Sequence, residues 1–413
     1  MEPIRRHREQ GEKGDQQTLS SLSLAGGPNV AKERATGPKK KVAILAPVHA
    51  YNDIRVFHKE AKTLARAGYA VTLFARAERC FEEDGVTVVP LRAHQRRWRR
   101  FLALPALLFK VFRARADVYH LHNPDTLPIL LALKGLGKRV AYDTHEDFAE
   151  RIPLKTWIPS PFRRLTARFV VAGERLAGRL ADGTIATQPD VAARLGPRAV
   201  VVENAPFIDG ALIEQAEAFA EALPEQPAFR AVYAGSLNRV RGLLTMVRAI
   251  AGVNEHLPAR LWLIGRVEAP EALREAEQLD GWQYVDLIGW LPHQHEVFGY
   301  VQRADAGLAV FQNEAGYGRI SSNKLYEYLA LGVPVIASDF PAWRDKVGAW
   351  AASCFVDPEK PEAVAEKLVW LARHPGERAA LAEAGRRFIE TQFNWTIEGR
   401  KLLQVYERLC EFE

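Results

Sequence analysis

What this chain lacks narrows its class before any motif is considered. Its cysteines, Cys80, Cys354 and Cys410, are odd in number and far apart. This pattern indicates neither a disulfide framework nor a paired-cysteine zinc site, so we expect a protein of the reducing cytoplasm. No apolar run approaches the roughly 20 residues that a membrane-spanning helix needs. The N-terminus also lacks the apolar core of a signal peptide, so secretion is not expected.

The chain also contains no Asp-x-Asp sequence, the usual clamp for a metal ion and a diphosphate. We therefore expect no catalytic metal, and basic side chains and helix ends must neutralise any bound phosphate instead. The spacing of Asp143, His145 and Glu146 does not exclude a metal ion.

What is present is ordinary globular material that is long enough for two domains: 413 residues, 48% of them hydrophobic and 26% charged. Residues 1–38 show no sustained periodicity and are predicted to be a disordered tail. Beyond them, apolar strand-like runs alternate with helix-like patterns twice, which predicts parallel α/β sheets. We predict two Rossmann-like domains facing across a cleft, with residues 39–205 on the acceptor side and 228–395 on the donor side. They are joined by a linker, 206–227, and a C-terminal helix, 396–413, is expected to pack back on the first domain.

The most informative segment, SSNKLYEYLALGVPVIAS, covers residues 321–338. Asn323 is one of three residues that can cap a helix there, Lys324 and Glu327 share one face of its first turns, and Gly332 ends it. Free N–H groups at such a helix start attract phosphate, and a carboxylate one turn later can accept hydrogen bonds from a ribose. A nucleotide fits this arrangement, although a solvated Lys–Glu pair fits the spacing as well.

This segment resembles the retaining GT-B glycosyltransferases of family 4, whose nucleotide-sugar site carries a Glu, a helix of small residues and a Gly-x-Pro-Val turn. The resemblance covers Glu327, Ala330, Gly332, Pro334 and Val335. It implies that Glu327 grips the ribose of a nucleotide-sugar donor. The family has a second Glu eight residues earlier, where this chain has Arg319.

Other strand ends of the second half resemble the same family. Gly235 opens a loop in which Arg241, and in part Arg239, match the basic residues that meet the donor diphosphate. Two solvated arginines are the alternative. Gly265 and the turn of Gly289, Trp290 and Leu291 match the family's base-binding backbone, or are tight turns only.

In the first half, polar residues follow three predicted strands. Asn52, Asp53 and Arg55 resemble an Asn-Asp-x-Arg-Val turn of one family subgroup. The resemblance implies that His122 touches the donor sugar, while His120 is expected to be a packed core residue. Asp143, His145 and Glu146 resemble an Asp-x-His-Glu signature of the same subgroup and are expected on the acceptor side.

Two stretches are unusually basic. Residues 85–116 hold eight positive residues and no acidic one. A second run, Arg163 to Arg179, has Glu174 against it on a helix pattern. Both are typical of a surface for anionic lipid, and equally of core helices with solvated arginines. Nucleic acid is not expected, because no recognition module accompanies the basic pI. The residues predicted to meet the membrane are Arg96, Arg97, Arg99 and Arg100.

Taken together, these features predict a metal-independent, retaining glycosyltransferase. It needs no cofactor beyond a UDP- or GDP-linked sugar, and its acceptor is a glycan or a lipid-linked hydroxyl in cell-envelope synthesis. The expected location is cytoplasmic, with the inner face of the plasma membrane as the site of any attachment. A nucleotide-sugar epimerase and a non-catalytic sugar-nucleotide binding protein are the rival hypotheses, and a given fold hosts many functions.

Overall fold

The computed structural model describes residues 39–92, 102–155, 158–207, 209–225, 227–314, 322–350 and 352–411. The predicted disordered tail, the Arg96–Arg100 membrane surface and Arg319 lie outside these residues. Within the described parts, no helix combines the length and the hydropathy needed to cross a bilayer.

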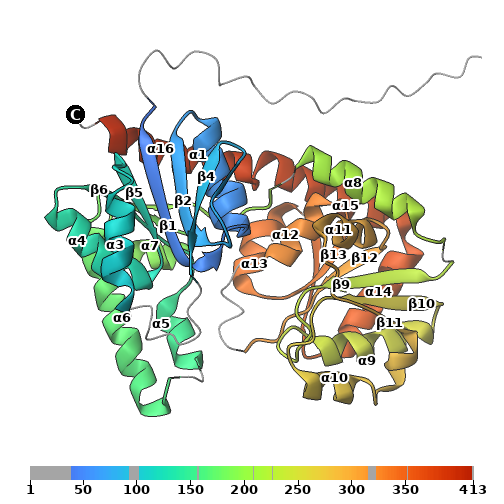
Figure 1. The fold of residues 1–413 in the computed structure, drawn as a ribbon. Helices are drawn as coiled ribbons and strands as arrows, with labels where there is room; N and C mark the ends of the chain where they lie inside the picture. The colour runs from blue at the N-terminus through green and yellow to red at the C-terminus, as the bar shows by residue number, and fades with distance from the viewer. Residues whose placement is uncertain are drawn as a thin grey trace, which may run out of the picture. The chain divides into compact units, whose positions relative to one another are not determined.

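The first half forms a parallel sheet in the strand order β3-β4-β2-β1-β5-β6-β7-β8, with β3 antiparallel to β4 at its edge (Figure 1). Its central strands are buried on both faces, which is why they read as nearly continuous apolar runs. The strands are β1 (Lys41–Ala50), β2 (Ala70–Arg76), β3 (Phe81–Glu83), β4 (Val86–Leu91), β5 (Val118–His122), β6 (Arg139–Thr144), β7 (Gly183–Ala186) and β8 (Ala199–Val201).

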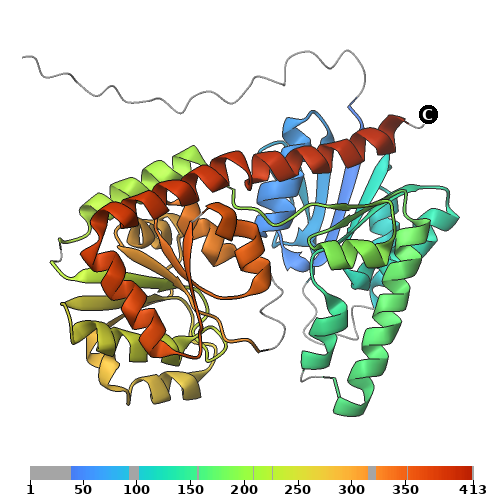
Figure 2. The ribbon, with the colours of Figure 1, turned by 180° about the vertical axis from the view of Figure 1, so that it is seen from behind.

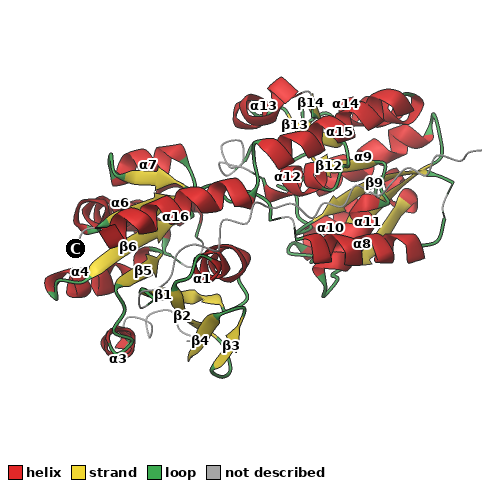
Figure 3. Cartoon of the chain, turned by 90° about the horizontal axis from the view of Figure 1, so that it is seen from above, coloured by secondary structure: helices red, strands yellow, loops and turns green. Residues whose placement is uncertain are grey.

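Helices cover both faces of this sheet (Figure 3). The helix after β1 is the π-helix η1 (Ile54–Ala61), which begins directly after Asp53 because the Asp53 carboxylate accepts hydrogen bonds from the N–H groups of Arg55 and Val56. The other helices are α1 (Lys62–Arg66), α3 (Leu104–Phe112), η2 (Pro124–Thr126), α4 (Leu127–Gly135), α5 (Phe148–Arg151), η3 (Ile152–Leu154), α6 (Ser160–Leu180) and α7 (Pro189–Leu195).

The second half forms a separate parallel sheet in the order β11-β10-β9-β12-β13-β14. Its strands are β9 (Phe229–Ala234), β10 (Ala259–Ile264), β11 (Val285–Gly289), β12 (Ala306–Ala309), β13 (Val335–Ser338) and β14 (Ser353–Val356). Its helices are α9 (Leu243–Asn254), α10 (Pro270–Ala276), η4 (Asp280–Tyr284), α11 (Gln294–Gln302), α12 (Asn323–Ala330), α13 (Pro341–Val347), η6 (Gly348–Trp350), α14 (Pro361–Arg373) and α15 (Pro375–Thr391).

Two further helices join these halves. The segment 206–227, expected as a linker, carries α8 (Gly210–Ala222), which packs on α11 through Ala216 and Ala220. The last helix, α16 (Trp395–Glu411), lies against η1, β7 and β8 of the first sheet, as Figure 2 shows in red. Its Trp395 indole donates a hydrogen bond to Thr63, at 2.9 Å.

The prediction of two Rossmann-like α/β domains is confirmed by these sheets. In both, the strand order reverses beside the first strand: β1 lies between β2 and β5, and β9 lies between β10 and β12. Loops diverge at such a point, so the carboxyl ends of β1 and β5 and those of β9 and β12 are where open parallel sheets bind ligands.

Candidate functional site

Glycines at three neighbouring strand ends open the donor side of the candidate site. The Gly235 N–H donates to the carbonyl of Ile264, and the Gly265 N–H donates to the carbonyl of Gly289. Gly265 has φ = 139°, and a Cβ built there would lie 1.9 Å from the Gly235 oxygen. Only glycine fits such a contact, so the ends of β9, β10 and β11 form a bare backbone edge that a ligand can approach.

Lys324 and Glu327 lie at the start of α12, beside this edge. The Lys324 ammonium contacts the Glu327 carboxylate at 2.8 Å. The Tyr328 hydroxyl accepts a hydrogen bond from the Ala234 N–H at 2.8 Å, which ties α12 to the end of β9. A Cβ at Gly235 would lie 3.6 Å from the Lys324 side chain. The structure therefore brings Gly235, Lys324 and Glu327 together as the sequence predicted, and Asn323 forms the first residue of the helix.

The predicted phosphate loop follows β9. The Asn238 side chain accepts a hydrogen bond from the Arg241 N–H at 2.9 Å, and the Arg241 guanidinium lies 4.6 Å from the centre of the Phe311 ring. Arg239 is paired with Glu275 at the surface, so its charge is already engaged. Gly242, with φ = 82°, would place a Cβ 2.1 Å from the Val310 oxygen, which explains a glycine there.

The predicted base-binding turn follows β11. Trp290 is exposed, and the Arg266 guanidinium lies 4.6 Å from the centre of its ring. Leu291 is half-buried and packs on the core of the second sheet. An exposed indole stacked with a cation provides a flat face for a ligand.

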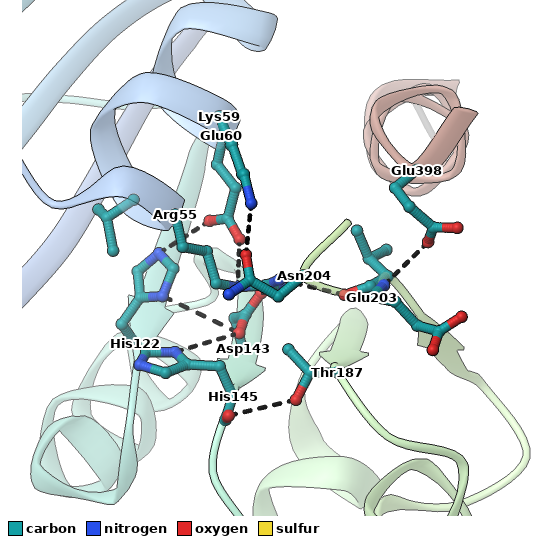
Figure 4. A network of polar contacts seen from close by, with 12 residues as sticks. Arg55, Lys59, Glu60, His122, Asp143, His145, Thr187, Glu203, Asn204 and Glu398 are labelled. Carbon is teal, nitrogen blue, oxygen red and sulfur yellow. Dashed lines mark hydrogen bonds and ion pairs between the residues drawn. The ribbon is translucent and has the colours of Figure 1, made fainter. Parts of the chain in front are cut away.

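In the first sheet, two predicted acceptor-side residues, Arg55 and Asp143, meet two histidines and Glu60 in what we call the buried polar cluster: Arg55, Glu60, His120, His122 and Asp143. The sequence had predicted His122 at the donor sugar and His120 in the core, and it had predicted no role for Glu60. Arg55 forms ion pairs with Glu60 at 2.8 Å and with Asp143 at 2.9 Å. His122 Nε2 lies 3.2 Å from a Glu60 oxygen (Figure 4). The His122 ring also stacks on that of His120. His120 also contacts the Tyr406 hydroxyl at 2.8 Å, as expected for a core histidine.

Burial sets the protonation of this cluster. It lowers the pKa of His120 to about 4 and that of His122 to about 3, so both imidazoles are neutral at pH 7. Burial would also raise the pKa of Asp143, but the Arg55 guanidinium and the neighbouring histidines together hold that pKa well below its usual range. Burial raises the pKa of Glu60 to about 7, against the same guanidinium. Arg55 and Asp143 are thus the charges that the cluster always carries at neutral pH.

The buried polar cluster also contains four possible ligands for a metal ion. Ligand atoms of Glu60, His120, His122 and Asp143 all lie within 4.8 Å of one another, a spacing that suits a divalent cation. Arg55, however, already contacts both carboxylates. A metal ion could enter only if the guanidinium moved away, because two cations would otherwise share one small buried space.

A partly exposed layer lies next to the buried polar cluster. The Asp53 carboxylate accepts a hydrogen bond from His49 Nδ1 at 3.0 Å, and His49 Nε2 contacts the Asn123 amide at 2.9 Å. The His145 ring lies 4.9 Å from that of His49. Burial would raise the pKa of Asp53, but the His49 hydrogen bond and the helix N–H groups hold it well below its usual range. Asn52 is exposed and Glu146 half-buried beside this layer.

The role predicted for His122, contact with the donor sugar, stays a prediction. Its ring is fully buried in the structure. His49 and Asn123 are the residues next to it that reach the partly exposed layer.

Asn123 is a residue whose importance the sequence did not indicate. Its backbone has φ = 68° and ψ = 159°, a combination that residues other than glycine rarely adopt. Such strain costs about 1–3 kcal/mol and persists where the surroundings hold it. Here the Asp143 carbonyl accepts the Asn123 N–H, and the Asn123 carbonyl accepts the Thr126 hydroxyl. Strained residues of this kind concentrate at functional sites.

A second group that the sequence did not reveal connects the two polar sites. The Lys59 ammonium donates to the Asn204 side chain at 2.6 Å, and the Asn204 amide donates to Asn323 at 3.5 Å. Burial lowers the pKa of Lys59 to about 7, although Glu327 acts in the opposite direction. The charge of Glu327, the predicted ribose-binding carboxylate, thus affects the protonation of Lys59. Residues this far apart in the sequence leave no local signal.

Comparisons with known proteins find glycosyltransferases in both halves of the chain. The family model for Glycosyl transferases group 1 matches residues 228–374, and the model for Glycosyltransferase Family 4 matches residues 55–203. A phosphatidyl-myo-inositol mannosyltransferase of Mycobacterium leprae is 23% identical over 71% of this chain and 74% of its own length. A D-inositol 3-phosphate glycosyltransferase of Corynebacterium urealyticum is 26% identical over 43% of this chain and 42% of its own.

Solved structures show the same fold. A sucrose-phosphate synthase from Thermosynechococcus elongatus superposes with a TM-score of 0.68 at 19% identity, covering 90% of this chain and 99% of the other. The Anabaena HepE protein in complex with UDP superposes with a TM-score of 0.65 at 15% identity, covering 89% and 99%. Because the two family models match one domain each and the fold is that of GT-B enzymes, this chain belongs to the group 1, family 4 glycosyltransferases.

Proposed function

We propose that this glycosyltransferase moves a hexose from a UDP- or GDP-linked donor to an acceptor hydroxyl with retention of configuration and without a metal ion. The acceptor belongs to lipid-linked or cell-envelope glycan synthesis at the cytoplasmic side of the membrane. Two findings support the substrates: HepE structures contain UDP and UDP-glucose, and the mycobacterial relative is named for phosphatidyl-myo-inositol. No further cofactor is part of the proposal, nor is a nucleic acid.

The observation that carries the proposal is the Lys324–Glu327 pair beside Gly235. An ammonium and a carboxylate, 2.8 Å apart at a helix start, can bind the diphosphate and the ribose of a nucleoside diphosphate, respectively. The carboxylate accepts hydrogen bonds from the ribose hydroxyls, while the ammonium and the N–H groups of α12 meet the diphosphate. Arg241 provides a second cation on the loop after β9.

In this mechanism the bond between the anomeric carbon and the diphosphate oxygen breaks while the acceptor oxygen bonds to the same face of the sugar, and the acceptor proton passes to the departing phosphate oxygen. Negative charge grows on the departing diphosphate. Lys324, Arg241 and the start of α12 stabilise that charge, and because they are held in place before the reaction, little reorganisation opposes the step. His49 and Asp53 lie at the acceptor side as hydrogen-bonding groups for the incoming hydroxyl.

Replacing Glu327 tests the ribose contact. We expect Glu327→Ala to weaken binding of UDP or GDP by about 1.5–3 kcal/mol, because two hydroxyls lose a charged acceptor. Isothermal titration calorimetry measures the change. The exposed Glu366→Ala in α14 is the matched control, and an unchanged nucleotide Kd in a folded Glu327→Ala protein removes this residue from the site.

Chelation tests metal independence. Because Arg55 already occupies the space between Glu60 and Asp143 and basic groups face the diphosphate, we expect turnover to persist in excess EDTA. Loss of activity that added magnesium or manganese restores would show that the buried polar cluster, or Asp143 with Glu146, binds a cation.

The activity itself is tested by incubating the protein with UDP- and GDP-sugars, with and without a membrane lipid extract as the source of acceptors. A transferase releases nucleoside diphosphate in an acceptor-dependent manner. Conversion of the sugar in the absence of any acceptor would instead identify an epimerase. Absence of turnover with tight nucleotide binding would favour a non-catalytic binding protein.

A further inference from the structure

Helix α6 exposes its large apolar side chains, unlike an ordinary surface helix. Its large apolar side chains, Phe162, Leu165, Phe169, Leu176 and Leu180, are between 38% and 68% exposed. At 100° per residue they fall in one stripe about 60° wide along a helix about 30 Å long. A surface helix normally turns such a stripe toward the core.

The side of α6 that packs on the domain, which borders the apolar stripe, consists mainly of small residues. A Cβ at Gly178 would lie 1.9 Å from the Leu195 oxygen, and one at Gly173 would lie 2.8 Å from the Leu127 side chain. Ala167 and Ala177 are buried on the same side. Glu174, also buried there, accepts a hydrogen bond from the Thr144 hydroxyl at 2.8 Å. These close contacts fix the rotation of the helix, so the apolar stripe cannot turn inward.

A second stripe, of arginines, runs beside the apolar one: Arg164, Arg168, Arg175 and Arg179, all exposed. The first three line a groove of about 460 Å³ between α6 and the segment of Ala149 and Pro153. The whole of α6 carries five arginines and one carboxylate, that of the buried Glu174. The exposed face of the helix is therefore both apolar and strongly positive.

We propose that this face of α6 docks on an anionic lipid bilayer. The apolar stripe enters the boundary between headgroups and acyl chains, and the arginines contact lipid phosphates from the adjacent groove. Long arginine stems cover apolar surface while their charged ends stay at the headgroups. In Figure 1 the N-terminal half of α6 extends beyond the strands of its own sheet, and the large apolar side chains of this half are exposed.

Charge favours a membrane over a second copy of this chain. If α6 packed on its symmetry mate, arginine stripes would border the seam on both helices, and α6 offers no exposed carboxylate to pair with them. Anionic lipid supplies the missing negative charge. This surface is independent of the proposed transfer reaction, because none of its residues belongs to the donor or acceptor side described above.

The test is flotation of the full-length protein with vesicles of phosphatidylcholine, alone or mixed with phosphatidylglycerol. We expect binding to the mixed vesicles only, falling steeply as salt rises, because screening acts over about 10 Å at 0.1 M. The combined change Phe162→Ser, Leu165→Ser and Phe169→Ser should weaken partitioning at least about ten-fold. Arg164→Gln, Arg168→Gln and Arg175→Gln together should weaken it about a hundred-fold.

Leu287→Ser in β11 and Arg387→Gln in α15 are matched exposed controls and should bind vesicles as the wild type does. Circular dichroism verifies that each variant is folded. Equal binding to neutral and anionic vesicles, or wild-type binding by both combined variants, would overturn the proposal. So would a wild-type dimer in light scattering that the triple serine variant converts to a monomer. Vesicle binding is read without substrate, so failure of the transferase proposal would show separately, as absent turnover with a water-soluble acceptor.

Discussion

Lys324→Ala should lower kcat by about 10²–10³-fold while leaving the fold intact, because removing one preorganised group from a developing charge costs roughly 3–4 kcal/mol. The Lys324 side chain is partly exposed, and its ammonium pairs with the Glu327 carboxylate on the same helix. Donor turnover measured at saturating nucleotide-sugar gives kcat directly. Binding of the uncharged nucleoside should be unchanged, since that part of the donor meets Glu327.

The exposed Lys367→Ala in α14 is the control for loss of a positive charge and should turn over normally. A Lys324→Ala enzyme with near-normal kcat would mean that the diphosphate lies elsewhere. Arg241 and the turn after β9 would then be the remaining candidates for the cation that meets it.

Asp143→Ala should reduce the free energy of unfolding by about 3–5 kcal/mol, the cost of leaving a buried partner charge uncompensated. Asp143 is fully buried and lies 2.9 Å from the Arg55 guanidinium. Glu60 replaces it only in part, because burial raises the pKa of Glu60 and so opposes its ionisation. Urea unfolding at pH 7 measures the loss.

Asp286→Ala is the matched control for this loss. Asp286 pairs with Arg260 in β10 and β11, but both side chains are about one third exposed. Water can solvate Arg260 once its partner is gone, so the expected loss is at most about 1 kcal/mol. Equal losses of unfolding free energy from the two substitutions would show that burial of the Arg55–Asp143 pair does not increase the cost of breaking it.

The strongest local signals in the sequence predicted which residues of the second sheet and of α12 lie close together, while their role at a donor stays a prediction. Lys324 and Glu327 are three residues apart, a spacing that puts them on one helical face in any context. The glycines at 235, 265 and 289 follow apolar strands, and parallel strands end on one edge of their sheet. Both relations depend on short segments of chain, so they could be predicted without the tertiary structure.

The acceptor side could be predicted only in part. Arg55 and Asp143 were expected near each other as strand-end residues, but Glu60 was not, because residues five apart do not share a face of an α-helix. The π-helical turn of η1, with its wider winding, brings the Glu60 carboxylate to 2.8 Å from Arg55. His122 was expected at the ligand, whereas its ring is fully buried in the structure.

Local pattern thus determined the order of strands and helices, the two-domain architecture and the Lys324–Glu327 pair, because periodicity and spacing act over a few residues. Tertiary contacts decided which face of an element is buried. In α6 an apolar stripe and an arginine stripe lie side by side, and by composition the apolar stripe is the one expected to face the core. Close packing of Gly178 on Leu195 and of Gly173 on Leu127 chose the small-residue face, since no larger side chain fits there. That choice depends on distant residues, which no local pattern contains.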